Sequence, residues 1–85
     1  MSKPYYVYFL QSQKDGSYYI GVTVNTAARL KDHNTGLSKS TEPKRPWVLK
    51  RIEKYPDIKT AYRRERFLKA KKSRKIIKKI IESGK

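Results

Sequence analysis

The sequence contains no cysteine and only one histidine, His33. Without thiols the chain can form neither disulfides nor a thiolate zinc site, and a single histidine excludes a multi-histidine metal centre. Any metal ion would therefore be a hard cation held by oxygen ligands and water. Long hydrophobic runs are also lacking. The run Tyr5–Leu10 is too short to span a bilayer and is not a secretory signal, so we expect a cytoplasmic protein without a membrane segment.

Acidic residues are scarce as well. Seven aspartate and glutamate residues stand against 22 lysine and arginine residues, so the net charge is +15. An excess of this size attracts polyanions through a long-range field, and nucleic acid is the commonest such partner. An anionic membrane surface, or a charged surface that only keeps the protein in solution, are the alternatives.

The residue pattern predicts one domain, residues 1–85, of the α/β (α+β) class. Aromatic and β-branched residues favour strands at residues 5–12, 17–23 and 47–55. Helical spacing favours a helix to about residue 34, a second to about residue 70 and a third that includes residues 76–81, with a loop at residues 36–46. Asn25 or Thr26, Asp57 and Ser73 are the candidate caps of the three helices, and Gly36 is the stop of the first. The expected architecture is a three-stranded, mostly antiparallel sheet flanked by helices, in the order β-β-α-β-α-α.

An Asp-Gly pair, Asp15-Gly16, predicts a hairpin between the first two strands. Side chains alternate between the faces of a strand, so a four-residue loop places Tyr8 opposite Gly21 and diagonal to Tyr19 on the same face. Gly21 then leaves a gap above the sheet. Alternatively, the tyrosines are ordinary strand residues, each with a buried ring and a hydrated hydroxyl.

Two polar residues of the first predicted helix, Arg29 and His33, are spaced i, i+4 and share one face. Arginine can bind a phosphate through two hydrogen bonds, and a neutral histidine can accept a proton near physiological pH. A solvent-exposed pair without a role is the alternative.

The second predicted helix carries a carboxylate within its apolar stripe. A carboxylate on a core-facing stripe is costly unless it is paired with a cation or a metal ion. Glu65 is therefore either a metal ligand or part of a structural salt bridge to Arg29 or a nearby lysine. The stripe that we expect to face the core consists of Ile58, Ala61, Tyr62, Glu65 and Leu68.

Taken together and in order, these residues resemble the GIY-YIG endonuclease family. Tyr6-Val7-Tyr8 is similar to the first motif, and Tyr19-Ile20-Gly21, ten residues further on, matches the second. Arg29 and His33 match the family's Arg-x-x-x-His helix. Arg63-Arg64-Glu65 resembles the segment with the metal-binding glutamate, and Arg45-Pro46-Trp47 resembles the approach to the third strand in small stand-alone members.

The resemblance implies a metal-dependent endonuclease that hydrolyses phosphodiester bonds with one divalent cation, Mg²⁺ or Mn²⁺. It assigns Tyr8 as the general base, with His33 relieving it of a proton, and Tyr19 as a hydrogen-bond partner of the nucleophile or phosphate. Arg29 would stabilise charge on the phosphoryl oxygens, and Glu65 would hold the cation. A cation and an arginine nearby would also favour the phenolate form of Tyr8.

The expected substrate is DNA, cut with low sequence specificity, and branched, damaged or flapped DNA of the kind met in DNA repair is the suggested form. The first motif lacks its glycine, with Tyr6 there instead, and no asparagine follows Asn34. A nucleic-acid-binding domain of the same fold without catalysis is therefore the alternative. Ribosomal RNA is a further ligand that the charge permits, and a larger repair or processing complex is a further partner.

Basic residues near the predicted site are expected to hold phosphates without reading base sequence. Binding should then weaken with salt, with a log–log slope of about −0.9 for each phosphate contacted on duplex DNA. The residues predicted to contact nucleic acid are Lys39, Lys44, Arg45, Arg63, Arg64, Lys69, Lys71, Lys72 and Arg74.

Overall fold

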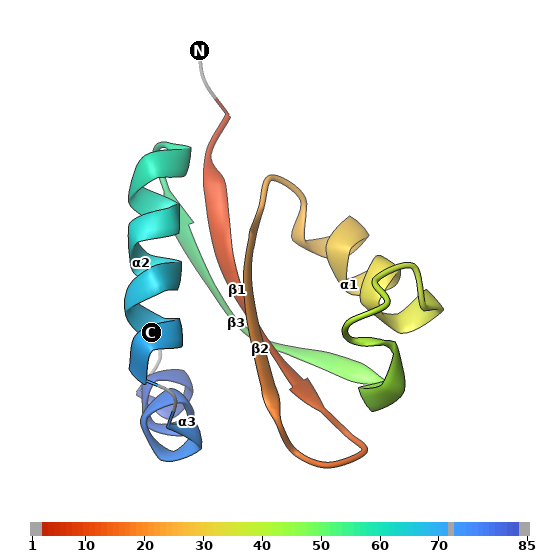
Figure 1. The fold of residues 1–85 in the computed structure, drawn as a ribbon. Helices are drawn as coiled ribbons and strands as arrows, with labels where there is room; N and C mark the ends of the chain where they lie inside the picture. Colours follow the sequence, from red (N-terminus) through yellow and green to blue (C-terminus); the bar gives the residue numbers. More distant parts are fainter. Residues whose placement is uncertain (1–2, 72, 84–85) are drawn as a thin grey trace.

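The computed structural model describes residues 3–71 and 73–83, and its elements follow the predicted order β-β-α-β-α-α (Figure 1). A short 3₁₀ helix, η1, lies within the predicted loop and is the one element that the sequence pattern did not predict. The elements are β1 (Tyr5–Ser12), β2 (Tyr18–Thr23), α1 (Thr26–Thr35), η1 (Glu42–Lys44), β3 (Trp47–Tyr55), α2 (Ile58–Lys71) and α3 (Arg74–Glu82).

The sheet is antiparallel, with β1 in the centre and β2 and β3 at its edges. A backbone hydrogen bond of 2.8 Å from Ser12 to Ser17 closes a four-residue hairpin loop. The register pairs Tyr8 with Gly21, as predicted. Helix α1 covers one face of the sheet, and α2 and α3 cover the other (Figure 1).

The two faces of the sheet carry separate clusters of buried residues, because neighbouring side chains on a strand point in opposite directions. Toward α1 lie Tyr8, Leu10 and Trp47, with Tyr19 packed against them. The cluster toward α2 and α3 consists of Val7, Phe9, Ile20, Ala61, Leu68 and Ile77. The polar chemistry of the hairpin therefore belongs to the α1 face, and most of the apolar core belongs to the other.

The predicted helix boundaries are confirmed by their caps. The Asn25 side chain accepts a hydrogen bond from the backbone of α1, and the Ser73 side chain does the same for α3. Gly36 ends α1 at a φ of 88°, a left-handed conformation that glycine adopts without steric cost. These caps fix where the chain turns and thus how α1 lies above the sheet.

The predicted core stripe of α2 is only partly confirmed. Ala61 and Leu68 are buried, but Ile58 is 40% exposed and Tyr62 is 48% exposed, so these two residues were wrongly placed in the core. The sheet has only three strands, and α2 meets it along a narrow line through residues two turns apart. Among the described residues, no helix is long and apolar enough to cross a membrane.

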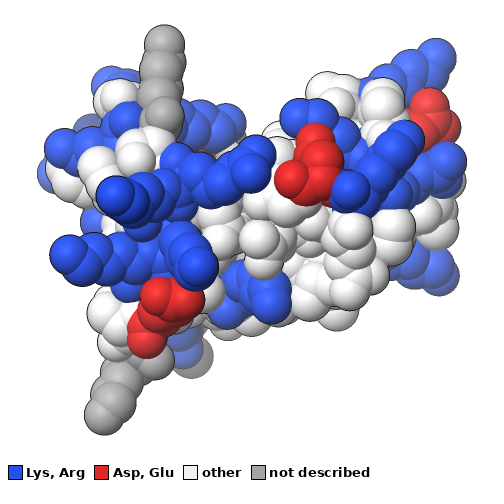
Figure 2. Space-filling model, turned by 90° about the horizontal axis from the view of Figure 1, so that it is seen from below, with Lys and Arg blue, Asp and Glu red and all other residues white. Residues whose placement is uncertain are grey.

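The excess of positive charge lies on two sides of the molecule. On the face seen in Figure 2, most lysine and arginine side chains gather on two lobes, and the surface between them is largely uncharged. One lobe lies over the α2 and α3 side of the sheet, and the other lies over the α1 side. A polyanion can therefore be attracted to this face from either lobe.

Candidate active site

A buried tyrosine–histidine pair lies between the sheet and α1. The hydroxyl oxygen of Tyr8 on β1 is 3.0 Å from Nε2 of His33 on α1. Tyr8 is 2% exposed and His33 is fully buried, which excludes the interpretation of His33 as an exposed helix residue. The predicted proton acceptor and the predicted base thus share a hydrogen bond.

The hydrogen bonds around His33 favour the tautomer that carries its proton on Nδ1. When the Thr41 hydroxyl donates to the backbone carbonyl of Ser38, at 3.1 Å, its oxygen is left to accept from His33 Nδ1–H, at 2.7 Å. The other ring nitrogen, Nε2, then carries a lone pair and accepts the hydrogen bond that Tyr8 donates. Burial lowers the pKa of His33, and the Arg29 charge lowers it further, so the imidazole is neutral at pH 7.

Gly21 makes room for the Tyr8 hydroxyl. A Cβ atom built on Gly21 would lie 2.5 Å from the hydroxyl oxygen of Tyr8, far inside van der Waals contact. Only glycine can therefore stand opposite this tyrosine while its ring keeps the present position. The gap that the hairpin register predicts at Gly21 is filled by the Tyr8 hydroxyl.

Tyr19 lies on the same face of the sheet as Tyr8, as predicted. Its ring centroid is 6.2 Å from that of Tyr8 and 4.8 Å from that of His33. The ring centroid of Trp47 is 6.2 Å from that of Tyr19, and the two rings lie edge to face. Four aromatic side chains with polar atoms, those of Tyr8, Tyr19, His33 and Trp47, are thus neighbours on this face of the sheet.

Arg29 is half-buried at the rim of this cluster and forms an ion pair with Asp32 at 3.3 Å. Burial raises the pKa of Tyr8, whereas the Arg29 guanidinium lowers it and the nearby Tyr19 and Glu65 raise it. Arg29 therefore lowers the pKa of Tyr8, as expected, but the effect of burial is larger and the pKa is raised overall. The protein groups alone keep Tyr8 as a phenol at neutral pH.

Glu65 projects from α2, on the opposite side of the sheet from α1. Its carboxylate is 3.3 Å from the ammonium of Lys69, and its side chain is 20% exposed. The predicted alternative of a salt bridge to a nearby lysine is thus present, whereas Arg29 pairs with Asp32. The Lys69 ammonium also lies 5.8 Å from the ring centroid of Tyr19 on the edge strand β2. Lys69 therefore contacts both the Glu65 carboxylate and the tyrosine cluster.

The donor atoms around Glu65 fit a hard cation with few protein ligands. Within residues 3–71 and 73–83, no three histidine, aspartate or glutamate side chains come together. Magnesium commonly keeps several waters and takes one or two carboxylates plus substrate phosphates, which one accessible carboxylate can satisfy. Lys69, at 54% exposure, would have to move away from Glu65.

The basic residues predicted to contact nucleic acid lie on both sides of the sheet, and Lys72 is outside the described residues. Lys44 is the last residue of η1, Lys39 and Arg45 lie before and after that helix, and the other described members belong to α2 and α3. All of the described members are exposed except Arg64, which is half-buried. Its guanidinium donates two hydrogen bonds, of 2.9 and 3.0 Å, to Glu53 on β3. A phosphate would have to displace Glu53 to bind it.

Three residues with defined roles were missed by sequence reasoning. Thr41 orients the His33 ring, Asn34 bonds both backbone groups of Trp47, and Glu53 ties β3 to α2. The first two depend on the path of the loop between α1 and β3, which composition does not reveal. For Glu53, a signal existed, because a lone acid within a basic strand indicates a paired carboxylate.

Fold and site together define a small α+β domain in which two strand tyrosines meet a helix histidine. The GIY-YIG catalytic domain matches residues 4–79, and the chain belongs to the GIY-YIG family. A UPF0213 protein of Bacillus cereus is 36% identical over 70 residues, which cover 81% of this chain and 73% of that protein. A UPF0213 protein of Staphylococcus haemolyticus is 42% identical over 62 residues, covering 72% of this chain and 74% of that protein. No solved structure matches significantly.

The predicted family is thereby confirmed, and with it the nuclease fold. The names of the UPF0213 relatives state no reaction, so the reaction itself has to be inferred from the site.

Proposed function

We propose that this protein is a metal-dependent endonuclease that hydrolyses phosphodiester bonds in DNA and has low specificity for the base sequence. The observation that carries the proposal is the 3.0 Å contact between the Tyr8 hydroxyl and the neutral, oriented His33. A phenol alone is a poor base at neutral pH because its pKa is about 10. A phenol that can pass its proton to a neutral imidazole does not need to ionise beforehand.

The proposed reaction begins with proton transfers at Tyr8. The Tyr8 oxygen would accept a proton from the attacking water while its own proton passes to Nε2 of His33. Thr41 would hold the imidazolium through its Nδ1–H. Tyr19 would hydrogen-bond the water or a phosphate oxygen, and Arg29 would stabilise the charge that develops on the phosphoryl oxygens.

Glu65 is the residue that would hold a divalent cation, Mg²⁺ or Mn²⁺. The cation would supply positive charge at the scissile phosphate and the leaving oxygen. Lys69 neutralises the same carboxylate in its absence. When the cation binds, it would therefore replace the Lys69 ammonium as the positive partner of Glu65.

DNA is proposed because the positive lobes offer phosphate contacts and no base-reading module is evident in the sequence. A place in DNA repair belongs to the same proposal. Contacts of this kind would position the backbone near Tyr8 and leave the base sequence largely unread.

Nicking of supercoiled plasmid with Mg²⁺ or Mn²⁺ tests the proposal. The wild-type chain should nick, and Tyr8→Phe and Glu65→Ala should each lose about 10²-fold or more of the rate. Glu82→Ala, which removes an exposed carboxylate at the end of α3, is the matched control and should nick normally. If both site variants nick as fast as the wild type, the proposal fails.

A second candidate function is nucleic-acid binding without cleavage. The Glu65–Lys69 ion pair favours it, because the carboxylate already has a positive partner. A gel shift with no nicking under any divalent cation would support this alternative.

A further inference from the structure

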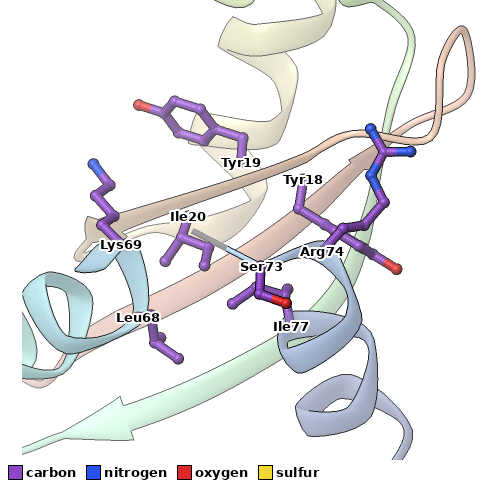
Figure 3. A pocket seen from close by; sticks show the side chains of 8 residues that line it. All are labelled: Tyr18, Tyr19, Ile20, Leu68, Lys69, Ser73, Arg74 and Ile77. Atoms are coloured by element: carbon purple, nitrogen blue, oxygen red, sulfur yellow. The ribbon is translucent and has the colours of Figure 1, made fainter. Parts of the chain in front are cut away.

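A cavity of about 280 Å³ opens beside the β2 edge, where α2 meets α3 (Figure 3). It does not include the Tyr8–His33 pair and shares only Tyr19 and Lys69 with the residues of the candidate active site. Its lining residues are Tyr18, Tyr19, Ile20, Leu68, Lys69, Ser73, Arg74 and Ile77.

The floor of this cavity is apolar and its wall is aromatic. Ile20, Leu68 and Ile77 are almost completely buried and form the inner surface. Tyr18 is half-buried and points to the α2 and α3 side of the sheet, opposite to Tyr19. A flat apolar group in the cavity can thus lie against the Tyr18 ring and the aliphatic floor.

The rim of the cavity is cationic. Lys69 and Arg74 stand on opposite sides of it, both exposed, and none of the described residues that line it is acidic (Figure 3). A ligand that combines an apolar flat part with negative charge complements this arrangement. A nucleotide has both properties, since its base is flat and its phosphates are anionic.

The cavity is adjacent to the candidate active site through two shared residues. Tyr19 lines the cavity and also packs against His33, while Lys69 lies at the rim and pairs with Glu65. A strand that passes the β2 edge can therefore touch the site and the cavity at neighbouring nucleotides.

We propose that this cavity receives one unpaired base of the nucleic-acid substrate, with its flanking phosphates held by Lys69 and Arg74. The proposal deepens the proposed function, on which it rests for the position of the strand. A paired base would have to be unstacked before it could enter, so DNA with an unpaired nucleotide is preferred over continuous duplex.

Binding of three fluorescent DNA probes of equal length in EDTA tests this inference without requiring cleavage. The probes are a duplex, the same duplex with one bulged base, and the bulge with that base replaced by an abasic site. The bulged probe should bind about tenfold tighter than the duplex, and the abasic bulge should lose most of that gain. Equal binding of bulged and abasic probes by the wild-type chain would overturn the inference.

Two matched pairs of variants locate the effect. Tyr18→Leu should abolish the preference for the bulge, whereas Tyr62→Leu, which removes an exposed tyrosine of α2, should retain it. Arg74→Gln should weaken bulge binding more than Lys75→Gln, its neighbour outside this cavity. If Tyr18→Leu keeps the full preference while remaining folded by circular dichroism, the bulge is recognised elsewhere and the inference fails.

The outcomes separate the inference from the proposed function. Nicking without any bulge preference leaves the nuclease proposal standing and removes the cavity proposal. A bulge preference without nicking leaves the cavity proposal standing and removes the nuclease proposal. A dimer in sedimentation that Tyr18→Leu dissociates would identify a second copy of the chain as the occupant and would also remove the cavity proposal.

Discussion

At Gly21 the absence of a side chain is what allows Tyr8 to reach His33. Gly21→Ala should push the Tyr8 ring away, cost about 1–3 kcal/mol of unfolding free energy and abolish nicking. A double-mutant cycle checks the cause. In a Tyr8→Leu background, whose shorter side chain leaves space, the alanine should cost clearly less. An equal cost in both backgrounds would place the strain elsewhere.

His33 is the only histidine, so its titration can be followed without ambiguity by NMR. Burial and Arg29 lower its pKa in the folded protein. Between that value and the unfolded pKa of about 6.5, the unfolded chain binds more protons, so stability falls as the pH falls below about 6.5. Chemical denaturation from pH 7 to 5 should show this loss in the wild type.

The control for this pH effect is His33→Gln, which cannot titrate in that range. Its unfolding free energy should change much less between pH 7 and 5. An identical pH dependence in both proteins would mean that other groups cause it.

At the scale of elements, a polar contact links β3 to α2. Glu53 accepts hydrogen bonds from Arg64, Arg51 and Tyr55. Burial on its own would raise the pKa of Glu53, but these bonds outweigh it and the pKa is lowered. The ion pair thus stabilises the fold above the ordinary glutamate pKa and is lost as the pH falls through the lowered value.

Arg64→Met should therefore destabilise the protein by about 1–3 kcal/mol, because it leaves Glu53 without its two-bond partner. Its neighbour Arg63 is exposed, and Arg63→Met should cost less than about 0.5 kcal/mol. Urea denaturation of the two variants measures the difference. Equal losses would show that the pair contributes nothing specific.

The elements themselves were predictable because their signals are local. Strand alternation, the Asp15-Gly16 turn and the caps at Asn25 and Ser73 depend on nearby residues only, and each is confirmed. The orientation of α2 was less predictable. Helical periodicity predicted a wide apolar stripe on α2. The three-stranded sheet is too narrow to cover all of that stripe, so Tyr62 is exposed.

At the site, the residues that could be predicted are those of the hairpin face and the helix spacing. The shared face of Tyr8 and Tyr19 follows from the hairpin register, whereas the pairing of His33 with Tyr8 follows from the resemblance to the family and not from the spacing of the helix residues. Thr41 could not be predicted, since its contact with His33 depends on the course of an irregular loop. The metal-binding role of Glu65 remains a prediction.

At the scale of the whole molecule, the net charge of +15 should govern DNA affinity. The logarithm of the binding constant should fall with the logarithm of salt concentration by about 0.9 for each phosphate contacted. Lys71→Gln, at the end of α2, should reduce this slope by about one phosphate contact. Lys59→Gln, in the first turn of α2, is the control and should leave the slope unchanged. A salt-independent affinity would contradict an electrostatic mode of binding.

The central claim is that Tyr8 and His33 work as one proton-transfer unit, and single-turnover cleavage of DNA by the two single variants and the double variant tests it most directly. If Tyr8→Phe and His33→Gln each remove the same unit, the double variant should be about as slow as the slower single variant, because effects within a unit are not additive. Rate losses that multiply in the double variant would contradict the account, as would a single variant that cleaves at the wild-type rate.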